Sequence, residues 1–247
     1  MNIEEKYKKL EELLKEAGRV VVAYSGGVDS SFLLKAASEI LGLENVLGCY
    51  AVSPSQPGVQ YERALRVAES IGVELVVVET DELEDERYVA NEADRCYWCK
   101  RHIVEAIREA GRERGFEVVV CGNNYDDLSD YRPGNKALDE YGVLCPLADA
   151  GLGKAEIREL SRGLGLETAE VPASPCLASR IAYGLEITEE RLRQIDEAED
   201  FLRNLGFVEF RVRHHGDIAR VEVRREGFDK IMSAQMRDRV VEKLKGL

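Results

Sequence analysis

The segment from Ser25 to Ser31, with the sequence Ser-Gly-Gly-Val-Asp-Ser-Ser, has the residue types of a loop that binds phosphate. Its adjacent glycines let the backbone approach a phosphate closely, and three serine hydroxyls add hydrogen-bond donors. The apolar run ending at Ala23 predicts a buried strand, and Phe32 and Leu33 predict a helix face. A strand, a turn and a helix N-terminus in this order direct unpaired N–H groups at one point. The sequence therefore predicts an anion site made by Ala23, Ser25, Gly26, Gly27, Asp29, Ser30 and Ser31.

This loop differs from two other phosphate-binding patterns. No Lys-Ser or Lys-Thr pair follows the glycines, so the segment is not a Walker loop. The glycines are adjacent and not spaced, so it is not the dinucleotide-binding fingerprint. An ordinary turn between a strand and a helix is the alternative interpretation, because glycines and serines are common in such turns.

Three cysteines form a second group of residues that could bind a metal or react. Cys96 and Cys99 make a CxxC motif that we expect directly before a helix, where the helix N-terminus and neighbouring basic side chains lower a thiol pKa. Cys176 lies in a second irregular segment. If both segments meet at one edge of a sheet, three thiolates can bind three irons of a 4Fe–4S cluster and leave one iron open. A zinc site, a redox pair or three unrelated cysteines are the alternatives.

The other three cysteines, Cys49, Cys121 and Cys145, lie in or beside predicted strands. We interpret them as small buried hydrophobic residues.

Polar side chains follow two of the predicted strands. The segment from Gly122 to Asp127 follows the strand at 118–121, and Ser53 follows the strand at 45–52. Carboxylates such as Asp127 could hold Mg²⁺ on a departing phosphate group or orient an acceptor. Asn-Asn and Asp-Asp pairs also make good turns, and Ser53 could equally be a turn residue.

Four arginines are candidates for holding a phosphate group, because a guanidinium binds phosphate with two parallel hydrogen bonds. They are Arg132, Arg180, Arg211 and Arg213. Arg211 and Arg213 alternate on one face of a predicted strand and can converge, although an exposed strand face would also explain them. Glu222, on the next predicted strand, is either an ion partner or a substrate ligand.

The elements that must position these residues alternate between strand and helix. Hydrophobic periodicity predicts a helix at 2–17, strands at 45–52, 73–79 and 118–121, a short fifth strand at 144–147, and helices at 59–70 and 154–164. This rhythm predicts an α/β fold with a doubly wound, parallel five-stranded sheet that binds ligands at the carboxyl ends of its strands. A helix at 188–205, strands at 207–214 and 217–224, and a helix at 228–244 predict a smaller α+β domain. We therefore expect domains at 1–184 and 185–247.

The composition of the chain disfavours nucleic-acid-binding proteins and membrane-spanning proteins. The 247 residues include 34 basic and 47 acidic side chains, for a net charge of −13, and nucleic-acid binding is disfavoured because it needs a basic surface. No apolar run approaches the roughly 20 residues of a membrane span, and the charged N-terminus is not a signal peptide. We therefore expect a cytoplasmic protein whose cysteines are thiols, metal ligands or redox groups.

The Ser-Gly-Gly-x-Asp-Ser-Ser segment resembles the PP-loop of the ATP pyrophosphatases, which cleave ATP between the α and β phosphates and leave an adenylated intermediate. The longer pattern is similar to the LarE family of ATP-dependent sulfur insertases, which build the nickel-pincer nucleotide cofactor of lactate racemase. The similarity runs from this loop to about residue 225. It rests on residues 130–134, the Cys176 segment through Tyr183-Gly184, Leu205-Gly206-Phe207, Arg211-Val212-Arg213 and residues 217–220.

The resemblance implies a reaction and a set of residues. The expected enzyme uses ATP and Mg²⁺ to adenylate a carboxylate of pyridinium-3,5-biscarboxylic acid mononucleotide, and then replaces it with a thiocarboxylate. One type of LarE gives up the sulfur of a single cysteine, and the other holds a 4Fe–4S cluster that carries sulfide. This chain resembles the second type through Cys96, Cys99 and Cys176. The implied catalytic residues are Asp29, Cys176, Ser179 and Arg180, and the implied binding residues include Ser53, Gly122, Asp127, Arg211, Arg213 and Glu222.

Other functions remain open at this point. A tRNA thiolation enzyme shares the loop and often three cysteines, and an amide-forming ATP pyrophosphatase shares the adenylation step. A nucleotide-binding regulator without turnover is a third alternative. We also expect a homo-oligomer, assembled through the small C-terminal domain, and the source of the sulfide is undefined.

Overall fold

The computed structural model describes residues 1–129, 133–172 and 175–247 of the chain. The chain divides into two compact units. The first consists of residues 1–53, 58–82 and 96–174, and the second of residues 54–57, 83–95 and 175–247. The boundary that we predicted near residue 185 lies within the second unit, which also takes two short segments from the first half of the chain.

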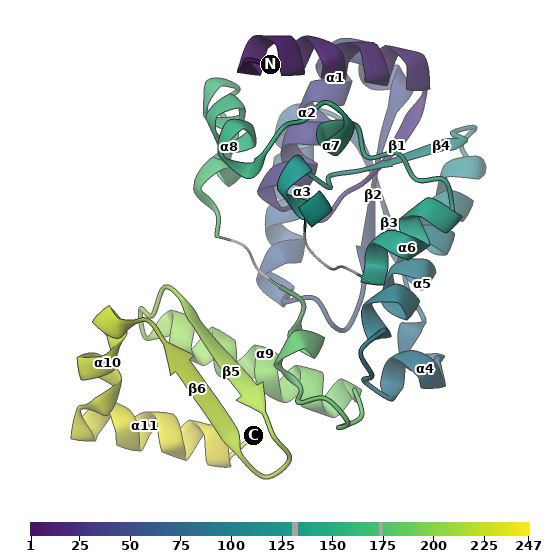
Figure 1. The fold of residues 1–247 in the computed structure, drawn as a ribbon. Helices are drawn as coiled ribbons and strands as arrows, with labels where there is room; N and C mark the ends of the chain where they lie inside the picture. The colour runs from purple at the N-terminus through teal and green to yellow at the C-terminus, as the bar shows by residue number, and fades with distance from the viewer. Residues whose placement is uncertain (130–132, 173–174) are drawn as a thin grey trace. The chain divides into compact units, whose positions relative to one another are not determined.

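The first unit is built on a parallel sheet, as the sequence predicted. Its strands are β1 (Val20–Ala23), β2 (Val46–Val52), β3 (Glu74–Glu79) and β4 (Val118–Cys121), in the order β3-β2-β1-β4 (Figure 1). Strand β1 is central, and its Val20 is in register with Val46 of β2 and Val118 of β4. The carboxyl ends of β1, β2 and β4 therefore share one edge of the sheet.

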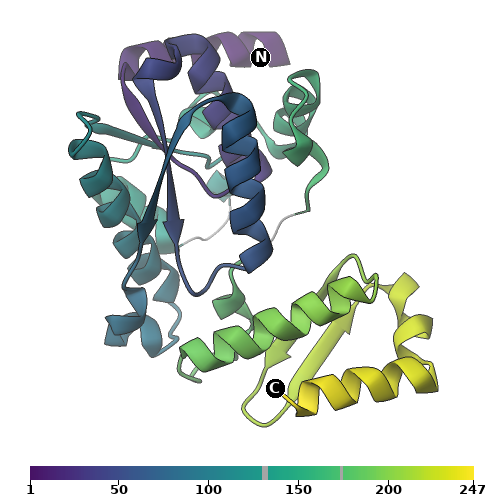
Figure 2. The same ribbon diagram turned by 180° about the vertical axis from the view of Figure 1, so that it is seen from behind.

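Helices cover both faces of this sheet, which confirms the doubly wound arrangement (Figures 1 and 2). Successive side chains of a strand point to opposite faces, so Val20 and Val22 pack in one core cluster and Val21 in another. The first cluster includes side chains from α1 (Ile3–Ala17), α2 (Val28–Leu41), α3 (Gly58–Ile71) and α8 (Lys154–Gly163). The second includes side chains from α5 (Arg95–Arg112) and α6 (Pro133–Glu140). Burial on both faces explains why β1 and β4 are continuous apolar runs.

The predicted fifth strand is wrong. Leu144 makes only a single parallel bridge with Val120, and the chain then enters the short helix α7 (Pro146–Asp149). Pro146 has no N–H with which to continue a ladder, and its fixed φ suits the first turn of a helix. The sheet therefore has four strands in the part of the chain that the structure describes.

The second unit contains α4 (Glu86–Val89), α9 (Glu189–Asn204) and an antiparallel pair of strands, β5 (Phe210–His214) and β6 (Ala219–Val223). The predicted helix at 228–244 is two helices, α10 (Arg225–Met232) and α11 (Ala234–Lys245), because Ser233 between them has an extended backbone. Ala198 and Leu202 of α9 pack on Val212 of β5 in a small core.

Five short 3₁₀ helices complete the described secondary structure: η1 (Leu43–Asn45), η2 (Glu82–Glu84), η3 (Tyr125–Ser129), η4 (Glu167–Glu170) and η5 (Leu177–Arg180). None of the described helices is both long and apolar enough to cross a lipid bilayer.

Candidate active site

The SGG loop, defined as residues 25–31, is shaped by close backbone packing. Gly26 has a φ of +69°, and a Cβ at this position would lie 2.8 Å from the Cβ of Ala64 on α3. Its carbonyl oxygen accepts a hydrogen bond of 3.1 Å from Nε of Arg63. Only glycine fits this conformation and this contact, so the first of the two glycines is required by the fold.

The two ends of the loop are joined by serine side chains. The backbone N–H of Ser25 donates to Oγ of Ser30 over 3.2 Å, and the two serine hydroxyls are 3.1 Å apart. Gly27 is the N-cap residue of α2, and no side chain of the described residues caps this helix. The N–H groups of the first turn of α2 therefore have no capping side chain among the described residues, and the predicted binding of an anion there stays a prediction.

Ser31 has a different environment from Ser25 and Ser30. It is fully buried, and its hydroxyl lies 3.5 Å from the hydroxyl of Tyr24 in the core. Burial raises the pKa of Tyr24 to about 12, so the phenol keeps its proton and donates to the carbonyl of Ala64 over 3.2 Å. Ser31 thus lies on the core side of α2.

Asp29 and Lys154 form an ion pair beside the loop. Nζ of Lys154 lies 2.5 Å from Oδ2 of Asp29, and Oδ1 of the same carboxylate is buried without a hydrogen-bond partner among the described residues. Lys154 is the first residue of α8, and its backbone N–H donates to Oδ2 of Asp126 over 2.8 Å. Sequence reasoning missed Lys154. The only signal was a lysine directly after Gly153 at the start of the predicted helix at 154–164.

The end of β4 packs directly on the loop. A Cβ on Gly122 would lie 2.8 Å from the backbone nitrogen of Ser30, so Gly122 lies against the first turn of α2. Farther on, Oδ2 of Asp127 accepts the N–H of Asn124 over 3.0 Å. Asp127 therefore stabilises the turn itself, and it is Asp126 that reaches α8.

Ser53, at the end of β2, is buried, and its hydroxyl donates to Oε1 of Glu82. Its predicted contact with a nucleotide stays a prediction.

The CxxC motif lies inside a helix and not before it, which corrects the prediction. Helix α5 begins at Arg95, so Cys96 and Cys99 occupy its first two turns. The segment contains neither Gly nor Pro, and nothing in it prevents an early helix start. Residues three apart on a helix lie on the same side, so the two thiols share one face of α5. Cys96 is exposed and Cys99 is partly exposed.

The Cys176 loop, defined as residues 175–184, is held in the second unit by a buried ion pair. Arg180 donates to the two carboxylate oxygens of Glu199 over 2.9 and 3.3 Å, and both side chains are about 95% buried. The same guanidinium donates to the carbonyl of Pro175 over 2.8 Å, and Ser179 Oγ donates to the carbonyl of Cys176 over 2.7 Å. Arg180 therefore fixes the loop, and as a buried partner of Glu199 it is not an open phosphate clamp.

Glu199 was missed from the sequence. It also accepts the backbone N–H of Val212 over 3.1 Å, and so joins α9, β5 and the Cys176 loop. The available signal was a carboxylate on the same helix face as Ile195, Ala198 and Leu202, all of which are buried.

The arginines of β5 lie on one face, as predicted, opposite the buried Val212. Arg213 donates to Oε1 of Glu222 over 2.8 Å and to the carbonyl of Ser179 over 3.3 Å. Hydrogen bonds from Arg213 and Arg220 lower the pKa of Glu222, which is an ion partner in the structure. Arg211 is exposed and has no ion pair within the described residues. Arg132, the remaining candidate clamp, lies outside the described residues.

Comparisons with known proteins agree with these features. The NAD synthase family model matches residues 2–122. An uncharacterised protein of Synechocystis is 41% identical over 90% of this chain and 82% of its own length. The pyridinium-3,5-bisthiocarboxylic acid mononucleotide synthase of Lactiplantibacillus plantarum is 36% identical over 85% of this chain and 76% of its own length. The chain belongs to the LarE family. Its SGG loop lies within the segment that the NAD synthase family model matches.

The three cysteines of the LarE pattern are divided between the units: Cys96 and Cys99 belong to the first and Cys176 to the second. In the described part of the chain, no three His, Cys, Asp or Glu side chains are grouped as a metal site. The predicted meeting of the three thiols stays a prediction.

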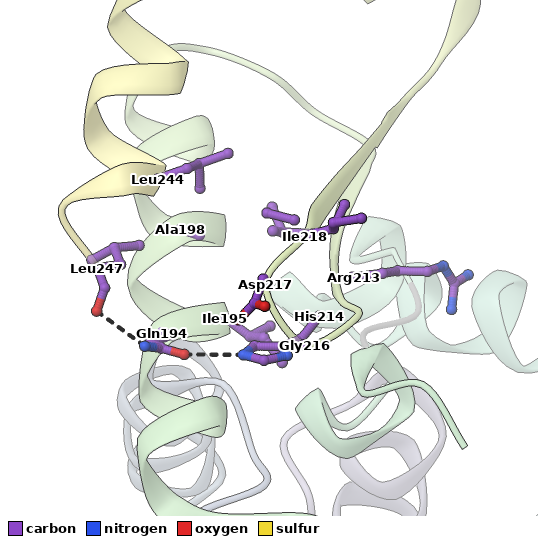
Figure 3. Close-up of a pocket in the computed structure, with 12 residues that line it drawn as sticks. Gln194, Ile195, Ala198, Arg213, His214, Gly216, Asp217, Ile218, Leu244 and Leu247 are labelled. Atoms are coloured by element: carbon purple, nitrogen blue, oxygen red, sulfur yellow. Dashed lines mark hydrogen bonds between the residues drawn. The ribbon is translucent and has the colours of Figure 1, made fainter. Parts of the chain in front are cut away.

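The second unit of this LarE protein also contains a cavity of about 150 Å³ that was not predicted. It lies between α9, α11 and the turn that joins β5 to β6 (Figure 3). Gln194 bridges the Nε2 of His214, at 3.1 Å, and the carbonyl oxygen of Leu247, at 3.0 Å. Arg213 is one of the residues that line the cavity, and in Figure 3 its guanidinium points away from Gln194 and His214.

Proposed function

We propose that this chain is an ATP-dependent sulfurtransferase that makes a thiocarboxylate from a carboxylate of pyridinium-3,5-biscarboxylic acid mononucleotide. The observation that carries the proposal is the family membership, shown by the relationship to the Lactiplantibacillus plantarum synthase, together with a PP-loop whose helix N-terminus is open to an anion. The site of the reaction would be the cytoplasm, and the enzyme would be a homo-oligomer.

The first step is adenylation. A carboxylate oxygen of the substrate attacks the α-phosphorus of ATP, the bond between this phosphorus and the α,β-bridging oxygen breaks, and pyrophosphate leaves. The N–H groups at the start of α2 stabilise the negative charge on the phosphates because they are fixed before the reaction. The carboxylate oxygen, which is a poor leaving group by itself, thereby becomes part of an AMP leaving group.

Asp29 and Lys154 would act on the same phosphates. The unpartnered Oδ1 of Asp29 is a ligand of the type that Mg²⁺ prefers. If Asp29 turns toward Mg²⁺ bound to ATP, the Lys154 ammonium at 2.5 Å loses its partner and can pair with the departing pyrophosphate. The ion pair of the structure would therefore be the resting arrangement of two groups that separate when ATP binds.

The face of β5 that carries Arg211 and Arg213 would bind the phosphate of the substrate. Arg211 is exposed and unpaired in the described part of the chain, whereas Arg213 already contacts Glu222 and the carbonyl of Ser179. Arg211 is thus the arginine with donors to offer, and Arg213 would add a second guanidinium while it holds the Cys176 loop.

Cys96, Cys99 and Cys176 would hold a 4Fe–4S cluster. Two thiols three residues apart on one helix face, one exposed and one partly exposed, fit two adjacent iron ligands. The residue before Cys96, Arg95, is part of the second unit, as is Cys176. Arg95 donates to Asn91, which donates to the carbonyls of Ala182 and Leu185 beyond Cys176. When bound, the cluster would supply sulfide from its open iron for the replacement of AMP.

A second candidate has one observation in its favour. The NAD synthase family model matches the first half of the chain, and an NH₃-dependent NAD⁺ synthetase of Methanococcoides burtonii is 30% identical over 63% of this chain. An enzyme of that kind would pass an adenylated carboxylate to ammonia and not to sulfide.

One experiment separates these functions. Pyrophosphate release is measured with MgATP and each of three acceptors: the pyridinium biscarboxylate mononucleotide with sulfide, the same compound with ammonia, and tRNA. We expect release that depends on the pyridinium compound, and a product in which sulfur replaces oxygen. A product that contains an added nitrogen, or release only with tRNA, would overturn the proposal.

The cluster is tested separately from activity. Visible absorption and iron content are measured after anaerobic reconstitution of the wild type, Cys96→Ser and the control Cys49→Ser. We expect both signals to fall in Cys96→Ser and to stay at the wild-type level in Cys49→Ser. Equal iron content in all three proteins would rule out the three-cysteine site.

A further inference from the structure

Two cysteines outside the proposed cluster lie in contact with each other. Sγ of Cys121, at the end of β4, is 3.3 Å from Sγ of Cys145, which precedes α7. Cys121 is 94% buried and Cys145 is partly exposed, and both belong to the first unit. The sequence predicted both as small buried hydrophobic residues, because they lie in or beside predicted strands. Nothing in the sequence pairs these cysteines, which are 24 positions apart.

The backbone places these cysteines at the spacing of a disulfide. The N–H of Cys121 donates to the carbonyl of Leu144 over 2.9 Å, and the N–H of Leu144 donates to the carbonyl of Val119 over 3.0 Å. These bonds hold the two segments side by side in parallel, as in a ladder. Neighbouring strands lie about 4.8 Å apart, within the range of Cα separations that disulfides span. A short movement of the two residues toward each other is enough to bring their sulfurs from 3.3 Å to the bond length of about 2.0 Å.

The pKa values of the two thiols are also shifted in opposite directions, as suits a pair in which one thiol is reactive. The hydrogen bond from the thiol of Cys145 lowers the pKa of Cys121, and the Lys100 ammonium of α5 contributes in the same direction against the opposing effects of burial and Asp127. The same hydrogen bond and burial raise the pKa of Cys145. Of the two, Cys121 is therefore the thiol that ionises more readily, and Cys145 is the one that keeps its proton and donates. By contrast, burial alone raises the pKa of Cys49 to about 12.

We propose that Cys121 and Cys145 form a redox-active dithiol, oxidised to a disulfide by a small peroxide such as hydrogen peroxide. The Cys121 thiolate attacks one peroxide oxygen, the O–O bond breaks, and Cys121 becomes a sulfenic acid while hydroxide leaves and takes up a proton. The sulfur of Cys145 then attacks the sulfur of Cys121, its proton goes to the departing oxygen, and a second water forms. Two thiols are oxidised by two electrons and one peroxide is reduced to two waters.

The position of the pair connects it to the PP-loop. Gly122 follows Cys121 directly, and a Cβ on Gly122 would lie 2.8 Å from the nitrogen and 3.0 Å from the Cα of Ser30. The end of β4 therefore has no room to move without moving the first turn of α2. Because a disulfide draws Cys121 toward Cys145, oxidation weakens the binding of ATP at this turn.

The experiment uses the full-length protein, purified without oxygen and then exposed to graded hydrogen peroxide. Remaining thiols are alkylated, and peptides are mapped by mass spectrometry. We expect a cross-linked peptide pair containing Cys121 and Cys145, lighter by two hydrogen atoms than the two peptides together. In Cys145→Ser this pair is absent, and Cys121 reacts with a reagent specific for sulfenic acids. In Cys49→Ser the cross-link forms as in the wild type.

The effect on ATP is measured in the same samples by equilibrium binding, without the pyridinium substrate, so its outcome is independent of the sulfurtransferase proposal. We expect oxidation to raise the Kd for ATP about tenfold, a dithiol reductant to restore it, and the double variant Cys121→Ser/Cys145→Ser to lose the response. If both thiols stay open to alkylation at every peroxide concentration, the dithiol proposal fails. A cross-link that leaves the Kd unchanged would overturn the connection to the PP-loop.

Discussion

The SGG loop and the Cys176 loop are both irregular segments, but they are held in different ways. The SGG loop is shaped by backbone: a glycine pressed against α3, an uncapped helix start and the end of β4. The Cys176 loop is held by charged side chains, of which the buried pair of Arg180 and Glu199 is the centre. A loop held by backbone leaves its N–H groups for a phosphate, whereas a loop held by side chains can place a particular residue such as Cys176.

This difference between the loops predicts that the largest loss of stability follows the removal of one buried charge in the second unit. Arg180→Met leaves the carboxylate of Glu199 buried without its partner, and breaking such a pair costs about 3–5 kcal/mol. We expect this loss in the free energy of unfolding from urea titrations. The matched control is Arg193→Met on α9, whose ion pairs with Glu190 and Glu197 are exposed and screened by solvent, so we expect a much smaller loss. Equal losses in the two variants would show that the buried pair does not hold the loop.

The SGG loop should respond to a single methyl group. Gly26→Ala forces a left-handed backbone on alanine and places its Cβ 2.8 Å from that of Ala64, at a cost of about 2–4 kcal/mol. We expect the loss of ATP-dependent pyrophosphate release, measured at saturating substrate. Gly18→Ala is the control, because Gly18 has a similar φ of +74° but nothing within 4 Å of its Cβ. If Gly18→Ala reduces the activity as much as Gly26→Ala does, close packing is not what shapes the loop.

The motif residues of the SGG loop could be predicted because strand, turn and helix follow one another directly in the sequence. The apolar runs of β1 and β4 and the periodic faces of α8 and α9 could be predicted for the same reason, since each pattern is local. The failures at Pro146 and Ser233 are local as well, and they arise where one residue ends an element that the surrounding pattern would continue.

The ion pairs at the two loops could not be predicted. Lys154 meets Asp29 across 125 positions, and Glu199 meets Arg180 across 19. Neither pair has a sequence pattern, because a contact between elements depends on how they pack. The sequence thus pointed to the candidate functional residues in both loops. It did not show which of their charges are already paired and which are available to a substrate.

Lys154 tests whether the first unit also depends on a charged side chain. Lys154→Met should lower the rate of pyrophosphate release about 10- to 100-fold, equivalent to the roughly 1.5–3 kcal/mol of a hydrogen bond to a charged group. We expect the fall mainly in kcat, and a partial rescue by Lys154→Arg. The control is Lys6→Met, which removes the ion pair of Lys6 with Glu156 on the same helix. An unchanged kcat in Lys154→Met would mean that the backbone alone serves the phosphates.

The smallest expected effect is a change with pH in the unfolding free energy, through Glu222 beside Arg213 on β5. Hydrogen bonds from Arg213 and Arg220 hold the pKa of Glu222 below its usual value of 4.5. A lowered carboxylate pKa stabilises the folded state above the unfolded pKa, and this contribution is lost as the pH falls through the folded pKa. The difference in unfolding free energy between wild type and Glu222→Gln should therefore be constant above about pH 5 and shrink below pH 4.5, as urea titrations at each pH would show. The effect is small because Glu222 is partly exposed and solvent screens its ion pairs. A difference that does not change with pH would mean that Glu222 acts on β5 and β6 through packing and not through its charge.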